Sequence, residues 1–205
     1  MKHVLWRWVL SILLGLGLAG LGAQAAELAA PIFNFHVVQT DASGQATVYR
    51  SGQPKTDADW AYLQQRGVRS VLKLNRHDAE VDAAQEMAQA QRHGIRLIPV
   101  YMQPEDFPHN WNLWAHPDEA TLMRAVKVLE DPANAPILVH CAHGQDRTGR
   151  VVAAYSVRNK GYCKSTAVAE MKHYGTSPFL RGLQPMVMGP LLREPPQCKT
   201  RFVPQ

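Results

Sequence analysis

Hydrophobic and polar positions along the chain switch repeatedly between the period of a strand and the period of a helix. Short apolar or alternating runs, bounded by Gly, Pro or Asn, predict four strands. These strands are Ala46–Ser51, Val68–Leu74, Ile95–Tyr101 and Pro136–Val139. Longer segments with apolar stripes, and with Thr, Pro or Gly at their ends, predict five helices. These helices are Thr56–Arg66, Asp78–His93, a helix that starts at Pro117, Thr148–Lys160 and Ser165–Tyr174.

Strands that alternate with helices indicate one architecture. Parallel strands need crossover connections, and the crossover helices cover the faces of the sheet. The continuous apolar run Pro136–Val139 is typical of a strand that is buried on both faces. The sequence therefore predicts an α/β fold with a central, mostly parallel sheet flanked by helices.

Three segments lack a regular pattern. Ala26–Gly44 has no sustained period and contains Pro31, which predicts an arm that leads into the fold. Met102–His116 is rich in Pro and Asn, and we expect an ordered functional loop there. From Thr176 onward, repeated prolines permit only short helical pieces.

The N-terminal residues 1–25 have the pattern of a signal peptide. Lys2 and Arg7 precede the apolar run Val9–Ala23, and small residues follow at Ala23-Gln24-Ala25. The run is shorter than the roughly 20 residues of a membrane-spanning helix, so cleavage near residue 25 is favoured over an uncleaved anchor. We therefore expect a periplasmic or secreted protein without a stable membrane anchor, in which residues 26–205 form a single domain.

Charge and cysteine content narrow the classes of partner. The net charge of +5 falls to +3 without Lys2 and Arg7, and no run of Lys and Arg reaches five residues, so no nucleic-acid partner is expected. The three cysteines are an odd number for an oxidising compartment. We predict that Cys163 and Cys198 form a disulfide and that Cys141 is free; the alternative is that Cys163 and Cys198 are unpaired thiols.

The segment His140–Gly149 lies between the buried strand and the helix that follows it. The carboxyl end of a parallel strand beside a helix N-terminus offers backbone N–H groups and a positive dipole, which suit a phosphate group. The same dipole, together with Arg147, favours the thiolate of Cys141 and makes it nucleophilic. Arg147 can also bind two phosphate oxygens with its guanidinium fork, and Gly144 permits a tight loop.

This segment resembles the active-site signature H-C-x-x-G-x-x-R-[ST]-G of the protein tyrosine phosphatase superfamily, and in particular its compact dual-specificity-like branch. Tyr49–Pro54 resembles the Y/F-R-S-x-Q-P motif of that branch, and the residues from Gly161 to Gly175 resemble its paired helices. With the export signal, the chain is most similar to periplasmic bacterial tyrosine phosphatases. The resemblance implies a dual-specificity phosphatase-like fold.

The resemblance also implies roles for individual residues. Cys141 would attack phosphorus and form a phosphocysteine intermediate, and Arg147 would bind the phosphate oxygens. His140 would hydrogen-bond the loop behind the cysteine, and Thr148 would donate its hydroxyl to Cys141. The remaining phosphate-binding positions would be Ala142, His143, Gly144, Gln145 and Asp146.

A general acid must protonate the leaving group. Members of the family carry an Asp on a loop before the cysteine, and Asp106 lies 35 positions ahead of Cys141 in the irregular loop. Glu105 and Asp146 are alternatives. An Asp directly before the signature Arg resembles the myotubularin-like pattern, which would point to phosphoinositide hydrolysis.

Other candidate residues have two readings each. His143 either contacts an anionic substrate or faces solvent, and Arg50 either supports the phosphate loop or forms a surface ion pair. Trp111 and Trp114 either line the substrate site or pack within their own loop. His140, Cys141 and His143 have no second cluster of ligands elsewhere in the sequence, so no metal is expected.

We therefore predict an exported hydrolase of phosphomonoesters that uses neither metal nor cofactor. The leading substrate is phosphotyrosine on a protein, with phosphoserine or phosphothreonine as a further substrate. The alternatives are an inositol phosphate or phosphoinositide phosphatase and, in a different class, a silent module that binds phosphoproteins. The intact Cys141, Arg147 and Thr148 argue against the silent module.

Overall fold

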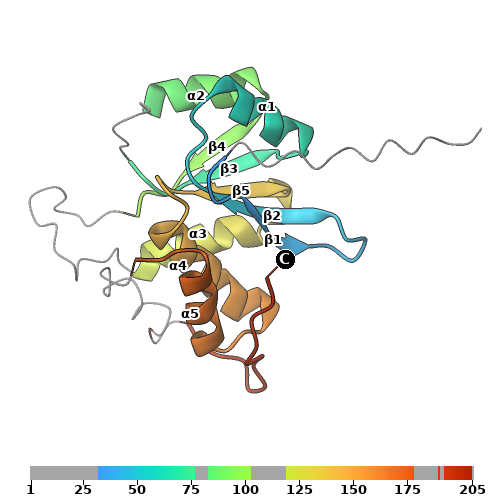
Figure 1. Ribbon diagram of the computed structural model, residues 1–205, viewed down its shortest axis with the longest axis vertical. Coiled ribbons are helices and arrows are strands. Elements are labelled where there is room, and N and C mark those ends of the chain that lie inside the picture. The colour runs from blue at the N-terminus through green and yellow to red at the C-terminus, as the bar shows by residue number, and fades with distance from the viewer. Residues whose placement is uncertain (1–31, 77–82, 103–118, 178–188, 190–191, 205) are drawn as a thin grey trace, which may run out of the picture.

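A computed structural model describes residues 32–76, 83–102, 119–177, 189 and 192–204. Its core is a five-stranded sheet in the order β1-β2-β5-β3-β4, with β5 at the centre (Figure 1). The pairs β2–β5, β5–β3 and β3–β4 are parallel, and only the edge strand β1 is antiparallel to its neighbour. The predicted mostly parallel sheet is therefore confirmed. The strands are β1 (His36–Thr40), β2 (Ala46–Ser51), β3 (Ser70–Lys73), β4 (Arg96–Pro99) and β5 (Ile137–His140).

Helices cover both faces of this sheet. Helices α1 and α2 lie on one face, and α3, α4 and α5 lie on the other (Figure 1). The described helices are α1 (Asp57–Gln65), α2 (Ala83–Arg92), α3 (Glu119–Glu130), α4 (Asp146–Tyr155) and α5 (Lys164–His173). Short helical turns follow α3 at Pro132–Asn134 and α4 at Ser156–Lys160.

Each face of the sheet carries its own hydrophobic core. Leu138 of β5 points into the core beneath α1 and α2, where it joins Trp60 and Leu63. Its neighbours Ile137 and Val139 point into the larger core beneath α3, α4 and α5. This alternation explains why the run in β5 is apolar without interruption, because both of its faces are buried.

The start of α1 follows from its capping residues. The hydroxyl of Thr56 accepts the backbone N–H of Asp59, and the Asp59 carboxylate accepts the backbone N–H of Thr56. This reciprocal pair satisfies N–H groups that the first helical turn leaves without partners. The predicted helix start at Thr56 is confirmed.

Two expectations about the elements were wrong. The segment predicted as an arm contains β1, because His36–Thr40 pairs with β2 and extends the sheet by an antiparallel edge strand. The helix predicted to begin at Thr148 begins at Asp146, so Arg147 and Thr148 lie in its first turn. Arg147 therefore lies within the first turn of α4, at the positive end of the helix dipole.

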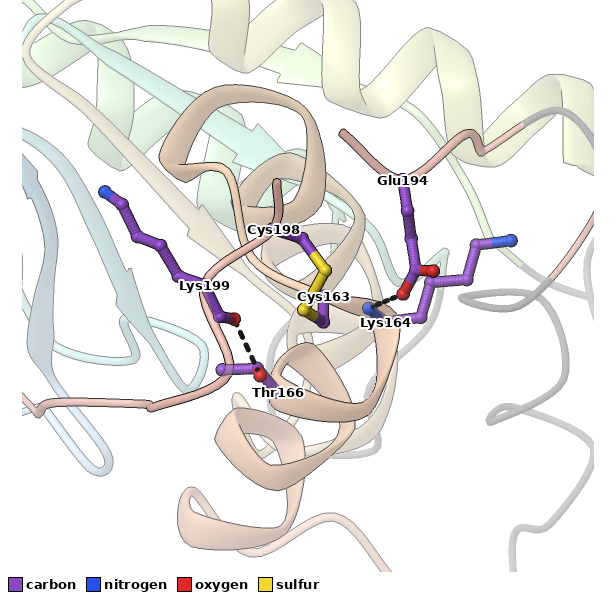
Figure 2. The surroundings of a disulfide bond; sticks show 6 residues. All are labelled: Cys163, Lys164, Thr166, Glu194, Cys198 and Lys199. Carbon is purple, nitrogen blue, oxygen red and sulfur yellow. Dashed lines mark hydrogen bonds between the residues drawn. A yellow bond between two sulfur atoms is a disulfide. The ribbon is translucent and has the colours of Figure 1, made fainter. Parts of the chain in front are cut away.

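The C-terminal tail is tied to the start of α5. Cys163 and Cys198 form a disulfide with a Cα–Cα distance of 4.8 Å, which confirms the predicted pairing, and Cys141 is free (Figure 2). The carbonyl of Lys199 accepts hydrogen bonds from the Cys163 N–H at 3.0 Å and from the Thr166 hydroxyl at 2.9 Å. The described segment 192–204 forms no helix or strand, and covalent and polar contacts together hold it.

Removal of the disulfide should lower stability strongly. The bond closes a loop with a sequence separation of 35 residues. For the double variant Cys163→Ala/Cys198→Ala we expect a loss of about 4 kcal/mol, since the unfolded chain regains the entropy of that loop. Urea unfolding of both proteins measures the difference. Thiol titration of denatured, unreduced wild type must give one free thiol per chain; three would contradict the pairing.

Within the described ranges, no helix has the length and apolarity that are needed to cross a membrane. The segment 1–31 lies outside these ranges, so the signal peptide stays a prediction.

Candidate active site

The signature loop connects the end of the central strand to the start of α4. Cys141 is the first residue after β5, and its side chain is 3% exposed. Gly144 has a φ of +66°, a left-handed conformation that side chains disfavour. A Cβ atom at Gly144 would lie 2.3 Å from the carbonyl carbon of Ser51. The loop can therefore press against the end of β2 only because residue 144 is a glycine.

Arg50 supports the loop from β2. Its guanidinium is fully buried, donates from Nη2 to the Gly144 carbonyl at 2.7 Å and lies 4.2 Å from the centre of the Tyr174 ring. Of the two predicted roles for Arg50, loop support is thus what the structure shows, and a surface ion pair is wrong. Burial lowers the pKa of Arg50 to about 10, so the group stays cationic at neutral pH and places a positive charge near Cys141.

The residues that follow Arg50 complete the scaffold of the loop. The Gln53 backbone N–H donates to the Ala142 carbonyl at 3.2 Å. A Cβ atom on Gly52 would stand 3.3 Å from that same carbonyl oxygen and 3.2 Å from the oxygen of Phe33. The motif from Tyr49 to Pro54 is therefore a platform beneath the loop.

His140 takes a partner that the sequence did not predict. Its Nε2 lies 2.9 Å from Oε1 of Glu86 on α2, and both side chains are fully buried. Among the described residues, the ring forms no hydrogen bond to the loop behind the cysteine, and its polar contact is with Glu86 instead, because a buried carboxylate requires a donor. The other oxygen of Glu86 accepts hydrogen bonds from Lys73 and, at 2.6 Å, from Gln53. His140 is thus a support of the site through α2.

The first turn of α4 holds the remaining signature residues. Arg147 is half-buried, and Thr148 is fully buried. Among the described residues, which include Cys141, the Thr148 hydroxyl oxygen has no hydrogen-bond partner. Its donation to Cys141 is therefore not formed in the structure, and a donation during the reaction stays a prediction. Asp146 accepts the backbone N–H of Ser177 at 2.8 Å, which joins the start of α4 to the residues after α5.

Other predicted residues are less constrained. His143 is exposed on the loop, and Ala142 and Gln145 are half-buried. The residues Glu105, Asp106, Trp111 and Trp114 lie outside the described ranges, so the predicted general acid Asp106 and its alternative Glu105 stay predictions.

A cluster of potential metal-ligating groups lies away from the signature loop. Side-chain atoms of Cys163, Glu194 and Cys198 are all within 4.8 Å of one another. Both sulfur atoms belong to the disulfide (Figure 2) and are not available as thiolate ligands.

Sequence reasoning missed two supports of the loop. Asn34 donates from Nδ2 to the Gly144 carbonyl at 2.9 Å and to the Tyr174 carbonyl at 3.2 Å. It has a φ of +57°, which Asn tolerates better than most residues. The second missed support is the buried pair of Glu86 and Lys73. A Lys in an interior strand with helices on both faces is the sequence signal that could have indicated a buried partner.

Comparison with known proteins agrees with this geometry. The family model described as "Tyrosine phosphatase family" matches residues 30–177. The dual specificity protein phosphatase TpbA of Pseudomonas aeruginosa is 27% identical over 175 residues, which cover 82% of this chain and 72% of that protein. The inositol diphosphatase DSP1 of Oryza sativa subsp. japonica is 36% identical over 105 residues, which cover 51% of this chain. The match spans only 43% of the rice protein.

Solved structures share the fold. The core catalytic domain of the PP-IP phosphatase SIW14 from S. cerevisiae has a TM-score of 0.60 and 22% identity, and covers 77% of this chain and 86% of that one. TpbA of P. aeruginosa in complex with pTyr has a TM-score of 0.54 and 25% identity, and the match covers 70% of this chain and 79% of that one. The chain therefore belongs to the tyrosine phosphatase family and is a phosphatase of the tyrosine and dual-specificity type.

Proposed function

We propose that the protein is an exported, cysteine-dependent phosphatase that hydrolyses phosphotyrosine on proteins through a phosphocysteine intermediate. The observation that carries this proposal is the position of the free Cys141 on a loop whose carbonyl groups are bound by residues outside the loop. Arg50 and the Gln53 N–H bind the carbonyls of Gly144 and Ala142. In a trans peptide the N–H points opposite to the C=O, so the N–H groups of His143 and Gln145 point away from this scaffold. They are free to face a phosphate.

The proposed reaction has two steps. In the first, the Cys141 thiolate attacks phosphorus, an S–P bond forms, and the bond from phosphorus to the leaving oxygen breaks while a general acid gives that oxygen a proton. In the second step, the general acid, which has lost its proton, acts as a base and takes a proton from water. The water oxygen attacks phosphorus, and the S–P bond breaks. For phosphotyrosine the products are the tyrosine phenol and inorganic phosphate, and the thiolate is restored.

The side chains of the loop favour a substrate with one phosphate. Between Cys141 and Arg147 the loop carries Ala142, His143, Gly144, Gln145 and Asp146. None of these five residues is a Lys or Arg, and Asp146 adds a negative charge. A densely phosphorylated ligand would need several cations to offset its charge. A phosphotyrosine side chain needs only the N–H groups and Arg147.

A second candidate is the hydrolysis of inositol phosphates. It is supported by the relatives, because DSP1 of rice is an inositol diphosphatase and SIW14 is a PP-IP phosphatase. The two candidates share the cysteine chemistry and differ in the charge of the substrate.

A substrate panel separates the candidates. Phosphotyrosine peptides, phosphoserine peptides, inositol phosphates and diphosphoinositol phosphates would be compared by phosphate release, with chelator present and vanadate as inhibitor. We expect the highest kcat/KM with phosphotyrosine peptides. A higher value with a diphosphoinositol phosphate would overturn the proposed substrate, and no release from any of them would overturn the proposed activity.

We further propose that Asp106 is the general acid. Asp106→Asn should slow the hydrolysis of phenyl phosphate on the order of a hundredfold and affect an activated aryl phosphate much less, since a good leaving group needs no proton. Asp146→Asn is the comparison, because one oxygen of Asp146 already binds the Ser177 N–H. If only Asp146→Asn shows the dependence on the leaving group, the assignment is wrong.

Export is supported by two independent features. The first 25 residues have the basic, apolar and small-residue regions of a signal peptide. The disulfide between Cys163 and Cys198 is typical of proteins in oxidising compartments.

A further inference from the structure

A closed group of buried polar side chains lies behind the signature loop. We call it the Glu86 network, and its side chains are at most 3% exposed. The carboxylate of Glu86 pairs with His140 through one oxygen and with Lys73 and Gln53 through the other, and the Asn75 amide donates to Gln53 Oε1 at 2.7 Å.

The ionisation of the network can be worked out from its donors and acceptors. Burial raises the pKa of Glu86, but the charges and hydrogen bonds of His140 and Lys73 outweigh it, and the pKa lies below its ordinary value. An ionised carboxylate carries no proton, so at 2.9 Å its Oε1 favours a proton on Nε2 of His140 over a second lone pair. Glu86 therefore favours one tautomer of the ring and restrains its position.

The network touches the signature loop at two places. His140 immediately precedes Cys141, so the position of its ring restrains the backbone from which the thiol projects. Gln53 binds Glu86 with its side chain and the Ala142 carbonyl with its backbone N–H. The Glu86 carboxylate on α2 is thus linked to both neighbours of Cys141, directly to His140 and through Gln53 to Ala142.

We propose that Glu86 is a positioning residue of the phosphatase reaction, which aligns Cys141 and the first N–H groups of the loop through His140 and Gln53. This proposal rests on the proposed function. Glu86 does not touch the substrate; it acts on the loop from behind. Buried ions cost free energy that a hydrophobic cluster would avoid, which is consistent with a role beyond stability.

The competing explanation is that Glu86 only neutralises Lys73. Both side chains are buried, and the loss of either leaves an uncompensated charge in the interior. Under this explanation, removal of both charges together should restore both stability and catalysis. Under the proposal, it should restore stability but not catalysis.

The test compares Glu86→Gln, Lys73→Met and the double variant Glu86→Gln/Lys73→Met. Thermal unfolding gives Tm, and hydrolysis of an aryl phosphate gives kcat and KM. We expect Glu86→Gln to lower Tm and to reduce kcat on the order of tenfold to a hundredfold, the cost of a slightly misplaced nucleophile, with little change in KM. The double variant should regain Tm but keep the low kcat, and Lys73→Met alone should lower Tm because it leaves the Glu86 carboxylate uncompensated.

Alkylation of Cys141 provides a readout that needs no turnover. Cys141 is the only free thiol when the disulfide is intact, so the rate with iodoacetate at pH 6 reports on its thiolate. The loss of one negative charge would by itself favour the thiolate and speed alkylation. A misaligned loop loses stabilising N–H groups, and we expect alkylation to slow severalfold in Glu86→Gln and in the double variant.

Asp59→Asn is the matched control. It removes another buried carboxylate, which caps α1 and accepts the backbone N–H groups of Lys55 and Thr56, so Tm should fall while kcat and alkylation stay near wild type. Recovery of kcat together with Tm in the double variant, or faster alkylation in both Glu86 variants, would overturn the positioning role. If the wild type hydrolyses no substrate, the proposed function fails, and the alkylation rates still decide the role of Glu86.

Discussion

Cys141→Ser is expected to abolish turnover while the protein continues to bind phosphate esters. A serine hydroxyl is almost entirely protonated at neutral pH and is a far poorer nucleophile than a thiolate, so the S–P bond cannot be replaced by an equivalent O–P bond. The carbonyls of Ala142 and Gly144 stay bound to Gln53 and Arg50, so the N–H groups that face the phosphate are kept.

Two measurements test this expectation. Phosphate release from an aryl phosphate should fall to background, and titration with a phosphotyrosine peptide should give a Kd close to the wild-type KM. Denatured, unreduced variant should contain no free thiol, which shows that the disulfide is intact. Hydrolysis near the wild-type rate would falsify the phosphocysteine mechanism.

Arg147→Lys should impair the enzyme almost as severely. The guanidinium fork can donate two parallel hydrogen bonds to phosphate oxygens, whereas an ammonium group acts as a single point charge. Since this pairing is expected to be strongest in the transition state, we expect a loss in kcat on the order of a hundredfold to a thousandfold.

Arg92→Lys is the matched control for that variant. Arg92 is an exposed arginine at the end of α2 that pairs with Asp57, far along the chain from the loop, and its replacement should leave kcat unchanged. Steady-state kinetics of both variants provide the comparison. A mild effect of Arg147→Lys would show that Arg147 does not bind the transferred phosphate.

Much of the fold follows from local patterns. The strand Pro136–Val139 and the capped helix at Thr56 are encoded in short windows, and the structure has both within a residue or two. The edge strand β1 is not encoded in this way, because its pairing with β2 is irregular and depends on a neighbour ten residues later. The start of α4 was misplaced because its N-cap, Gln145, makes no side-chain capping bond.

The residues of the site likewise fall into two groups, those that local sequence motifs predict and those that only the assembled fold brings together. Cys141, Arg147 and Arg50 belong to contiguous motifs, and these motifs indicate their roles. Glu86 lies on a helix in which Met87 is exposed and Ala90 is buried, and nothing in its spacing predicts a carboxylate that points inward. Its partners come from β3, β5 and the segment after β2, so only the assembled sheet brings them together.

The close approach of Gly144 to Ser51 sets a limit on how this loop can be redesigned. Any side chain at position 144 would collide with backbone atoms of Ser51 and Gly52, which cannot swing aside as a flexible side chain would. A library that seeks new substrate preference should therefore vary the exposed His143 and the half-buried Ala142 and Gln145. Position 144 should stay glycine in every member, and a grafted loop should be transplanted together with the segment from Arg50 to Gln53.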